Sequence, residues 1–214
     1  ENTMVIFLAD HGEMLGEHGF MGHGFGVYEE LIHVPLFIRV PEGHSERRID
    51  NRVSITQLFY TVLDYFGFES IAMPYADEVD VGSKSLLNKK WKEDAFSSYV
   101  ISEAYAPENA IKIMKNHAEE LIGRHHAEKT RYAVYKHDEK MIAVDDLSRT
   151  LYDLAGDPGE GHPYQNTQRV EELSKALDTY FELAETCRSG SSHRKISLND
   201  DLVQQRLRDL GYLE

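Results

Sequence analysis

A carboxylate, an imidazole and a glycine stand together at Asp10, His11 and Gly12, directly after an apolar run over residues 4–9. Aspartate oxygens and histidine nitrogens are common ligands of divalent cations, and glycine lets the backbone turn sharply beside them. The pair therefore predicts a metal site, with both side chains directed into one cleft. The alternative is structural: Asp10 would cap a turn, and His11 would satisfy nearby backbone groups.

The loop after this turn carries two more histidines, His18 and His23, among five glycines within residues 16–26. This glycine content is too high for the interior of a helix and suits a loop that bends closely around a small anion. His23 is a candidate for contact with such an anion, and the alternative is a loop histidine that packs on Tyr28. For Glu13, Glu29 and Glu30 we expect contacts with backbone N–H groups that hold the loop.

The apolar run over residues 4–9 is too short for a helix and is bounded by polar residues. It predicts a buried strand of a parallel sheet with helices on both faces, whose carboxyl end is where open α/β sheets bind ligands. Residues 34–40 predict a second strand. Ser54 and Gln57 have the spacing of a capping box, and Gly67 marks the end of the helix that follows. The predicted apolar face of this helix consists of Ile55, Leu58, Phe59, Val62, Leu63 and Phe66.

The remaining pattern predicts a connection over residues 69–92, with Leu86 and Leu87 as an anchor and Trp91 as a partly buried side chain that fills a gap. Strands are predicted over residues 98–103, 132–135, 140–144 and 150–154, separated by turn-forming residues, and together they form an antiparallel sheet. Helices are predicted over residues 107–125, 168–186 and 198–210, from apolar residues at helical spacing.

Two long motifs resemble one known family. The run DHGEMLGEHGF, followed by GHG, YEE, HVPL and IRVP, resembles the closing segment of the catalytic domain of sulfatases, in the alkaline phosphatase superfamily. The stretch LYDLAGDPGE is similar to a signature of the sulfatase C-terminal subdomain. Because the two motifs occur in the family's order, we expect an α/β fold: the C-terminal portion of an alkaline-phosphatase-like sandwich, plus a small four-stranded antiparallel sheet packed with helices.

The resemblance also implies an organisation and a chemistry. Residues 1–95 would be the C-terminal portion of the α/β catalytic domain, residues 96–186 a small α+β subdomain, and residues 187–214 a tail with a terminal helix. Asp10 and His11 would bind a divalent cation. In the family this cation is usually calcium, although an imidazole ligand suits manganese or zinc better. His23 stands where the family commonly has a lysine that contacts the sulfate of the ester substrate, and is the expected catalytic residue.

The nucleophile implied by the resemblance, a formylglycine made in a C/S-x-P-x-R motif, has no counterpart in this sequence. We therefore expect a piece of a longer sulfatase, inactive alone, whose partner is the missing N-terminal part of the same protein. Two alternatives remain: a phosphodiesterase or phosphonate monoester hydrolase of the same superfamily, and a non-catalytic module. An aryl sulfate and aryl phosphate assay of the isolated chain and the full-length protein would separate them.

The amino-acid composition of the chain argues against some kinds of binding partner. With 37 Asp and Glu against 23 Lys and Arg, the formal net charge is −14, which argues against nucleic acid or an anionic membrane as a partner. The only cysteine is Cys187, so there is no disulfide framework; a soluble protein is expected, with a cytoplasmic location favoured.

Overall fold

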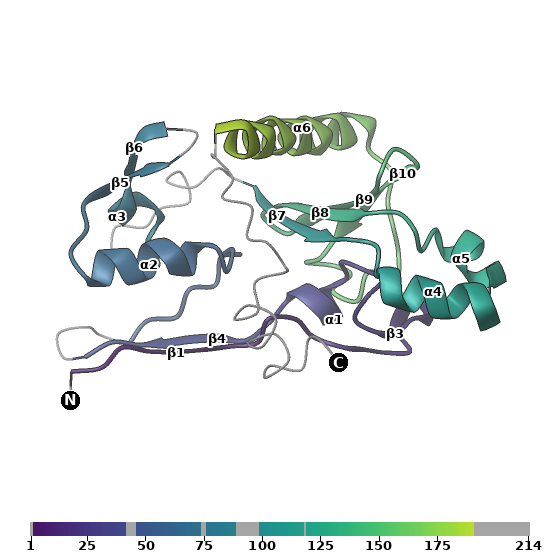
Figure 1. Cartoon of the computed structure of the whole chain (residues 1–214), viewed down its shortest axis with the longest axis horizontal. Helices are drawn as coiled ribbons and strands as arrows, with labels where there is room; N and C mark the ends of the chain where they lie inside the picture. Colours follow the sequence, from purple (N-terminus) through teal and green to yellow (C-terminus); the bar gives the residue numbers. More distant parts are fainter. Residues whose placement is uncertain (1, 42–45, 74–75, 89–98, 118, 191–214) are drawn as a thin grey trace, which may run out of the picture.

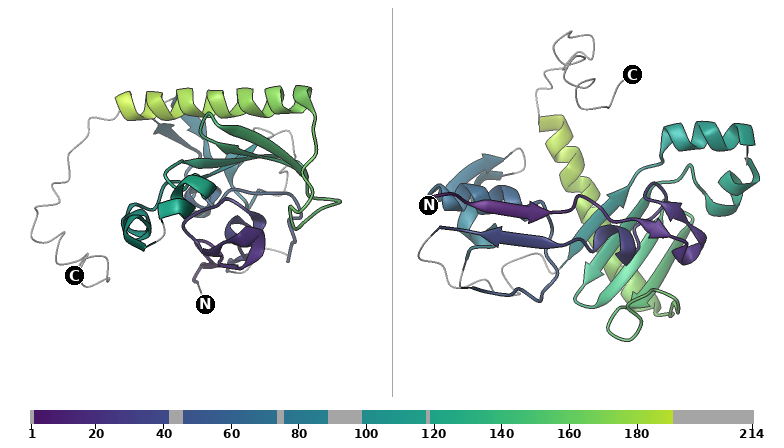
Figure 2. Two further views of the ribbon diagram at one scale, coloured as in Figure 1. Left: turned by 90° about the vertical axis from the view of Figure 1, so that its right-hand side faces the viewer. Right: turned by 90° about the horizontal axis from the view of Figure 1, so that it is seen from below.

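The computed structural model describes residues 2–41, 46–73, 76–88, 99–117 and 119–190. Figure 1 shows a four-stranded sheet (β7 to β10) with the long helix α6 along one face and the short helix α1 on the other side. A second group of elements, around helix α2, lies beside this sheet, and the paired strands β1 and β4 run below α2. Figure 2 gives the same arrangement from two further directions. Trp91 and the predicted helix over residues 198–210 lie outside the described residues.

The four predicted strands over residues 98–154 form one antiparallel sheet. They are β7 Val100–Ala104, β8 Arg131–Lys136, β9 Glu139–Val144 and β10 Ser148–Asp153, in the order β10-β9-β8-β7. Neighbouring strands pair without a register shift, so alternate residues face opposite sides of the sheet. This part of the sequence prediction is confirmed.

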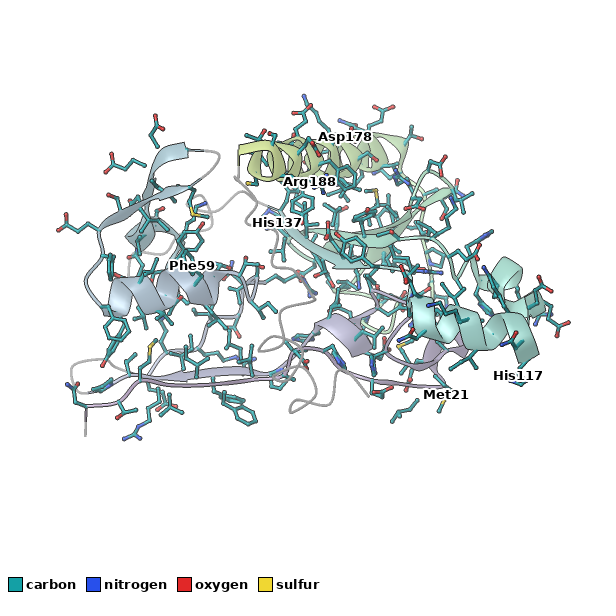
Figure 3. All side chains as sticks on the ribbon, viewed as in Figure 1. Met21, Phe59, His117, His137, Asp178 and Arg188 are labelled. Carbon is teal, nitrogen blue, oxygen red and sulfur yellow. The ribbon has the colours of Figure 1, made fainter. Side chains whose placement is uncertain are left out.

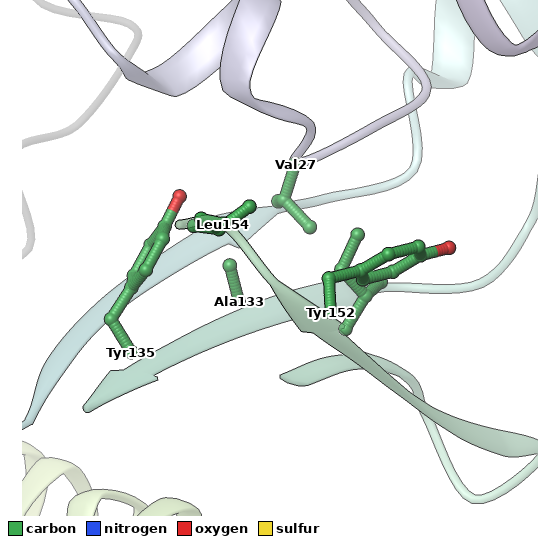
Figure 4. Close-up of a cluster of buried hydrophobic side chains, with 6 residues drawn as sticks. Val27, Ala133, Tyr135, Tyr152 and Leu154 are labelled. Carbon is green, nitrogen blue, oxygen red and sulfur yellow. The ribbon is translucent and has the colours of Figure 1, made fainter. Parts of the chain in front are cut away.

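Both faces of this sheet are covered. On one face, Leu173 and Leu177 of α6 (Thr167–Gly190) are buried against Val134, Met141 and Leu151. On the other face, a second cluster joins the sheet to the glycine-rich loop, and Figure 4 shows Val27 of that loop above the strands. The buried members of the second cluster are Val27, Ala133, Tyr135, Ile142, Tyr152 and Leu154. The small sheet is therefore the support on which the N-terminal loop rests.

The strand before Asp10 differs from its prediction. β1 (Val5–Leu8) pairs antiparallel with β4 (Leu36–Arg39), in the register Leu8↔Leu36, and no parallel pairing occurs among the described residues. The prediction of a buried parallel strand is therefore wrong for this chain. Phe7 is 62% exposed and Phe37 is 65% exposed, whereas Ile6, Leu36 and Ile38 on the other face of this two-stranded ribbon are half-buried.

Helix α2 (Gln57–Tyr65) starts and ends as predicted but buries a different face. The Gln57 side chain accepts the Ser54 N–H at 2.8 Å, as in a capping box, and Gly67 ends the helix with a φ of +82°. The buried residues are Gln57, Tyr60 and Thr61, whereas Phe59 of the predicted apolar face is 53% exposed (Figure 3). The prediction of the packed face is therefore wrong for Ile55, Phe59 and Phe66, whereas Leu63 packs against the cluster that contains Tyr60.

The predicted connection over residues 69–92 contains regular elements that the sequence analysis missed. β5 (Ser70–Met73) and β6 (Ala76–Asp80) form an antiparallel hairpin, and α3 (Val81–Lys84) follows directly. The buried residues Tyr60, Val79 and Val81 join α2, β6 and α3 in one cluster, which explains why α2 buries this face. Leu86 is buried, as expected for an anchor. Residues 107–125 contain two helices, α4 (Glu108–His117) and α5 (Glu119–His125), where one was predicted.

Candidate active site

The turn after β1 is held against the short helix α1 (Glu29–Ile32). The N–H of Gly12 donates to the carbonyl oxygen of Leu31 at 2.8 Å. A Cβ atom at Gly12 would lie only 1.9 Å from the carbonyl oxygen of Glu30, a distance that no side chain tolerates. The close approach of two backbone segments therefore requires glycine at this position.

Replacing Gly12 tests this close approach. We expect Gly12→Ala to push α1 away from the turn and to lower the free energy of unfolding by about 1–3 kcal/mol, the usual cost of overpacking. Urea denaturation measures the change. Gly123→Ala is the matched control, since a Cβ there meets nothing within 4 Å, and alanine should leave stability unchanged or raise it. Equal stability of Gly12→Ala and the original chain would contradict the observed packing.

Asp10 and His11 lie side by side with their ligand atoms close together. Oδ1 of Asp10 accepts the His11 N–H at 3.0 Å, and Nδ1 of His11 lies 2.8 Å from the carbonyl oxygen of Gly12. A carbonyl only accepts, so Nδ1 carries the proton and Nε2 keeps its lone pair. Nε2 lies 3.9 Å from Oδ2 of Asp10, and the two side chains are 46% and 89% exposed.

This pair fits a divalent cation. The 3.9 Å between Nε2 and Oδ2 can be spanned by one cation at ligand distances of about 2.0–2.6 Å. The hydrogen bond from Nδ1 to a backbone carbonyl is the outer contact that orients most metal-binding histidines. Two ligands are only part of a coordination shell, since calcium takes six to eight oxygens.

His23 joins this pair through a ring contact. Its imidazole stacks on that of His11, with ring centroids 4.3 Å apart and planes at 26°. Its Nδ1 lies 3.0 Å from Oε2 of Glu13, so the carboxylate orients the ring. The alternative that His23 packs on Tyr28 is wrong: His18 fills that place, with ring centroids 3.8 Å apart.

Glu13 is the site residue whose role the sequence analysis misjudged. The short strands β2 (Met14–Leu15) and β3 (Met21–Gly22) pair antiparallel, with Met14 opposite Gly22. The next pair outward is therefore Glu13 and His23, which places the carboxylate beside the imidazole. A contact of Glu13 with backbone N–H groups was expected instead. A hairpin centred on residues 17–19 would have been the signal for this pairing.

A second group of titratable side chains lies below the loop. His18, Glu30 and Glu160 each offer a ligand atom within 4.8 Å of the other two. However, Nζ of Lys140 lies 2.7 Å from Oε1 of Glu160, and the Lys140 side chain is fully buried. The ammonium already supplies the positive charge that a cation would bring, so this group fits an ion-pair cluster better than a metal centre.

Lys140 connects the two motifs that resemble sulfatases, because it contacts Glu29 of the first motif and Glu160 of the second. Nζ of Lys140 also lies 3.2 Å from Oε1 of Glu29, and Glu29 further accepts hydrogen bonds from Arg52, at 2.9 Å, and from the hydroxyl of Tyr135. The backbone N–H of Glu29 donates to Oε2 of Glu160 at 2.7 Å. The expectation that Glu29 holds the loop through backbone N–H groups is therefore wrong, because its carboxylate binds side chains, among them those of Arg52, Tyr135 and Lys140. We call Glu29, Arg52, Tyr135, Lys140 and Glu160 the buried ionic cluster.

Within the buried ionic cluster the pKa values of the two carboxyl groups, Glu29 and Glu160, shift in opposite directions. Burial raises the pKa of Glu160, and its ion pair with Lys140 offsets this only in part. Burial also acts to raise the pKa of Glu29, but the hydrogen bond from Tyr135 and the charges of Lys140 and Arg52 outweigh it and lower that pKa. The cluster thus holds two carboxyl groups against two cations, a balance that depends on Lys140.

An open cavity of about 1490 Å³ lies in front of Asp10, His11 and His23, all of which line it. The cavity is further lined by residues 31–40 and 46–56 of the N-terminal segments, by residues 100–105 of the small sheet and by Pro107. Arginines and acidic residues both line the cavity, so it suits a polar substrate that carries an anionic group.

This chain is similar in sequence and in fold to several known proteins. The sulfatase family model matches residues 1–68. N-acetylglucosamine-6-O-sulfatase of Bacteroides thetaiotaomicron is 28% identical over 169 residues, which cover 75% of this chain and 26% of that protein. Among solved structures, a putative sulfatase of the same organism matches with a TM-score of 0.59 at 18% identity, covering 88% of this chain and 38% of that one. A phosphonate monoester hydrolase of Agrobacterium radiobacter matches with a TM-score of 0.54 at 23% identity, covering 88% and 35%.

The structural matches show the fold alone: it is alkaline-phosphatase-like, and this chain has its mixed α/β part with the four-stranded antiparallel sheet. The sequence is similar to sulfatases, both to the family model over residues 1–68 and to the Bacteroides thetaiotaomicron relative. The chain spans about a quarter of the sulfatase relative, 26% of its length. None of the helices in the described part of the chain has the length and apolar character needed to cross a bilayer.

Proposed function

We propose that this chain supplies part of the active site of a sulfatase that hydrolyses sulfate esters. In this proposal Asp10 and His11 bind a divalent cation and His23 acts on the sulfate group. The observation that carries the proposal is that the three side chains line one cavity, within the segment that matches the sulfatase family model. The nucleophile, a formylglycine by family resemblance, would come from sequence outside this chain.

Sulfatases generally use a divalent cation. Here the carboxylate of Asp10 and Nε2 of His11 would hold it, and we propose calcium, with manganese or zinc as alternatives because one ligand is an imidazole. When bound, the cation would supply positive charge to the sulfate oxygens. The rest of its coordination shell would come from residues that this chain does not contain.

His23 would serve the sulfate group as a cation and a proton donor. Its Nδ1 contacts Oε2 of Glu13 at 3.0 Å, and its stacking on His11 places the ring next to the proposed metal ligand. A protonated imidazole stabilises negative charge on a sulfate oxygen, or transfers its proton to the leaving alcohol oxygen. Glu13 would orient the ring for either role.

The isolated chain and the full-length protein should behave differently. We expect the isolated chain to bind calcium or manganese weakly and to hydrolyse no aryl sulfate, because two ligands leave a hard cation largely hydrated. The full-length protein should bind the cation tightly and release sulfate. Titration calorimetry and a sulfate-release assay on both proteins measure this. Micromolar cation binding by the isolated chain that Asp10→Ala abolishes would contradict the ligand count, and turnover by the isolated chain would contradict the proposal of an external nucleophile.

A further inference from the structure

The stretch LYDLAGDPGE places a buried carboxylate against the N-terminal part of the chain. Glu160 ends this stretch, and its side chain is fully buried. Its Oε1 lies 2.7 Å from Nζ of Lys140, and its Oε2 accepts the backbone N–H of Glu29 at 2.7 Å, from a residue 131 positions earlier. The C-terminal motif therefore contacts the start of helix α1 directly.

Helix α1 depends on this contact because it has no side-chain cap of its own. Tyr28 occupies its N-cap position, and the Tyr28 side chain makes no capping hydrogen bond. The first N–H groups of a helix have no partner within the helix, so the N–H of Glu29 needs an acceptor from elsewhere. Glu160 is that acceptor, and the position of α1 is therefore set in part by Glu160.

The backbone at Glu160 adopts a conformation that is uncommon for a residue with a side chain. Its φ of +50° lies in the left-handed region, which favours glycine. The turn around it is held by Asp157, whose carboxylate accepts the N–H of Gly161 at 3.1 Å and the N–H of His162 at 2.7 Å. Such a conformation costs free energy and persists where the surrounding structure enforces it. The turn thus directs this carboxylate toward α1.

The other end of α1 holds the turn that carries the proposed metal ligands. The carbonyl oxygen of Leu31 accepts the N–H of Gly12 at 2.8 Å, and the carbonyl oxygen of Gly12 lies 2.8 Å from Nδ1 of His11. Gly12 is therefore fixed by α1 on one side and orients the His11 ring on the other. A displacement of α1 would change the direction in which Nε2 of His11 points relative to the carboxylate of Asp10.

We propose that Glu160 is a positioning residue of the metal site, which sets the affinity of Asp10 and His11 for the divalent cation through α1 and Gly12. This inference rests on the proposed function. Groups that orient a metal-binding histidine typically contribute about 10–100-fold to metal affinity. Because Glu160 acts through the backbone rather than on the ring itself, its contribution should lie at the lower end of this range.

The test measures calcium binding by the full-length protein, titrated by calorimetry after divalent cations have been removed with a chelator. We expect Glu160→Ala to raise the Kd for calcium about tenfold, the lower end of the usual effect of losing an outer contact. Turnover of 4-nitrophenyl sulfate at saturating calcium should stay within about threefold, since weaker binding is overcome by a higher concentration. Glu171→Ala, at an exposed position on α6, is the matched control and should leave the Kd within about twofold.

Three further variants separate positioning from a loss of stability, with circular dichroism to verify that each is folded. Lys140→Met keeps the hydrogen bond between Glu160 and Glu29, so it should destabilise the fold but leave the Kd within about threefold. Glu160→Gln retains an oxygen that accepts the Glu29 N–H and should recover most of the calcium affinity. Glu160→Asp keeps the charge but is one methylene too short for this hydrogen bond, and should raise the Kd about fivefold. This variant carries the test if Glu160→Ala does not fold.

The outcomes distinguish this inference from the proposed function. An unchanged Kd in Glu160→Ala and Glu160→Asp, with normal calcium binding by the original protein, would overturn the positioning role and leave the proposed function intact. An equal rise of the Kd in Lys140→Met would also overturn the positioning role, because the loss of stability would then explain the effect. An original full-length protein that binds neither calcium nor manganese would overturn the proposed metal site and this inference together.

Discussion

Lys140→Met should lower the free energy of unfolding of this chain by about 3–5 kcal/mol, the cost of removing one partner from a buried ion pair. Lys140 is fully buried, and its ammonium lies within 3.2 Å of Glu29 and within 2.7 Å of Glu160. Methionine keeps the volume and apolar character of the side chain but leaves the two carboxylates with only Arg52 as a cation. Urea denaturation followed by circular dichroism measures the loss.

The pH dependence of this variant provides a second check. The pKa of Glu160 is already raised by burial, and without Lys140 it should rise further. A carboxyl group whose folded pKa exceeds its unfolded value binds protons more tightly in the folded state, so lower pH favours folding. The deficit of Lys140→Met should therefore shrink as the pH falls from about 8 to about 5.5.

Two further variants complete this experiment. Lys112→Met, at an exposed position on α4, should change stability by less than about 0.5 kcal/mol. Adding Glu160→Gln to Lys140→Met should recover part of the loss, because the unpaired charge is removed. A deficit of Lys140→Met no larger than that of Lys112→Met would contradict the role of the buried ionic cluster.

The second large effect concerns catalysis. In the full-length protein, Asp10→Asn should lower kcat/KM for an aryl sulfate by about 10²–10³-fold, the usual effect of removing one electrostatic contributor to transition-state stabilisation. The substitution keeps the shape of the side chain and removes its charge, so the cation is held less tightly. Added calcium should then restore part of the activity, since weaker binding is overcome by a higher concentration.

Asp178→Asn is the control for the loss of one aspartate charge. Asp178 lies on α6, on the face of the small sheet away from the cavity (Figure 3), and its substitution should leave turnover unchanged. If Asp10→Asn retained the full activity and the full calcium affinity of the original protein, the proposed metal site at Asp10 and His11 would be wrong.

The parts of the fold that could be predicted from the sequence are those whose signals are local. Alternating residues and turn clusters predicted β7 to β10, and helical spacing predicted α6 within a few residues of its bounds. The direction of β1 is set by which strand it pairs with, and residues 4–9 contain no information about that partner. The exposed apolar face of α2 had the stronger pattern, yet Val79 and Val81 determine which face is buried.

In the candidate site, too, the sequence predicted the residues with a local signal and missed the contacts that depend on the folded chain. Asp10, His11 and His23 were found from residue type and motif, and the structure brings them to one cavity. The contact of Glu13 with His23 depends on a hairpin whose two strands have only two residues each, so the sequence shows no strand pattern there. Glu29 and Lys140 are 111 positions apart, so their ion pair exists only once the small sheet has packed against the loop.

The hydrolysis of matched aryl esters by the full-length protein tests the central claim most directly. The substrates are 4-nitrophenyl sulfate, 4-nitrophenyl phosphate and 4-nitrophenyl phenylphosphonate, compared by kcat/KM before and after removal of divalent cations with a chelator. We predict that the sulfate is the best substrate, that chelation abolishes its turnover, and that added calcium or manganese restores it. A higher kcat/KM for the phosphonate or the phosphate, or full sulfatase activity without a divalent cation, would contradict the proposed function.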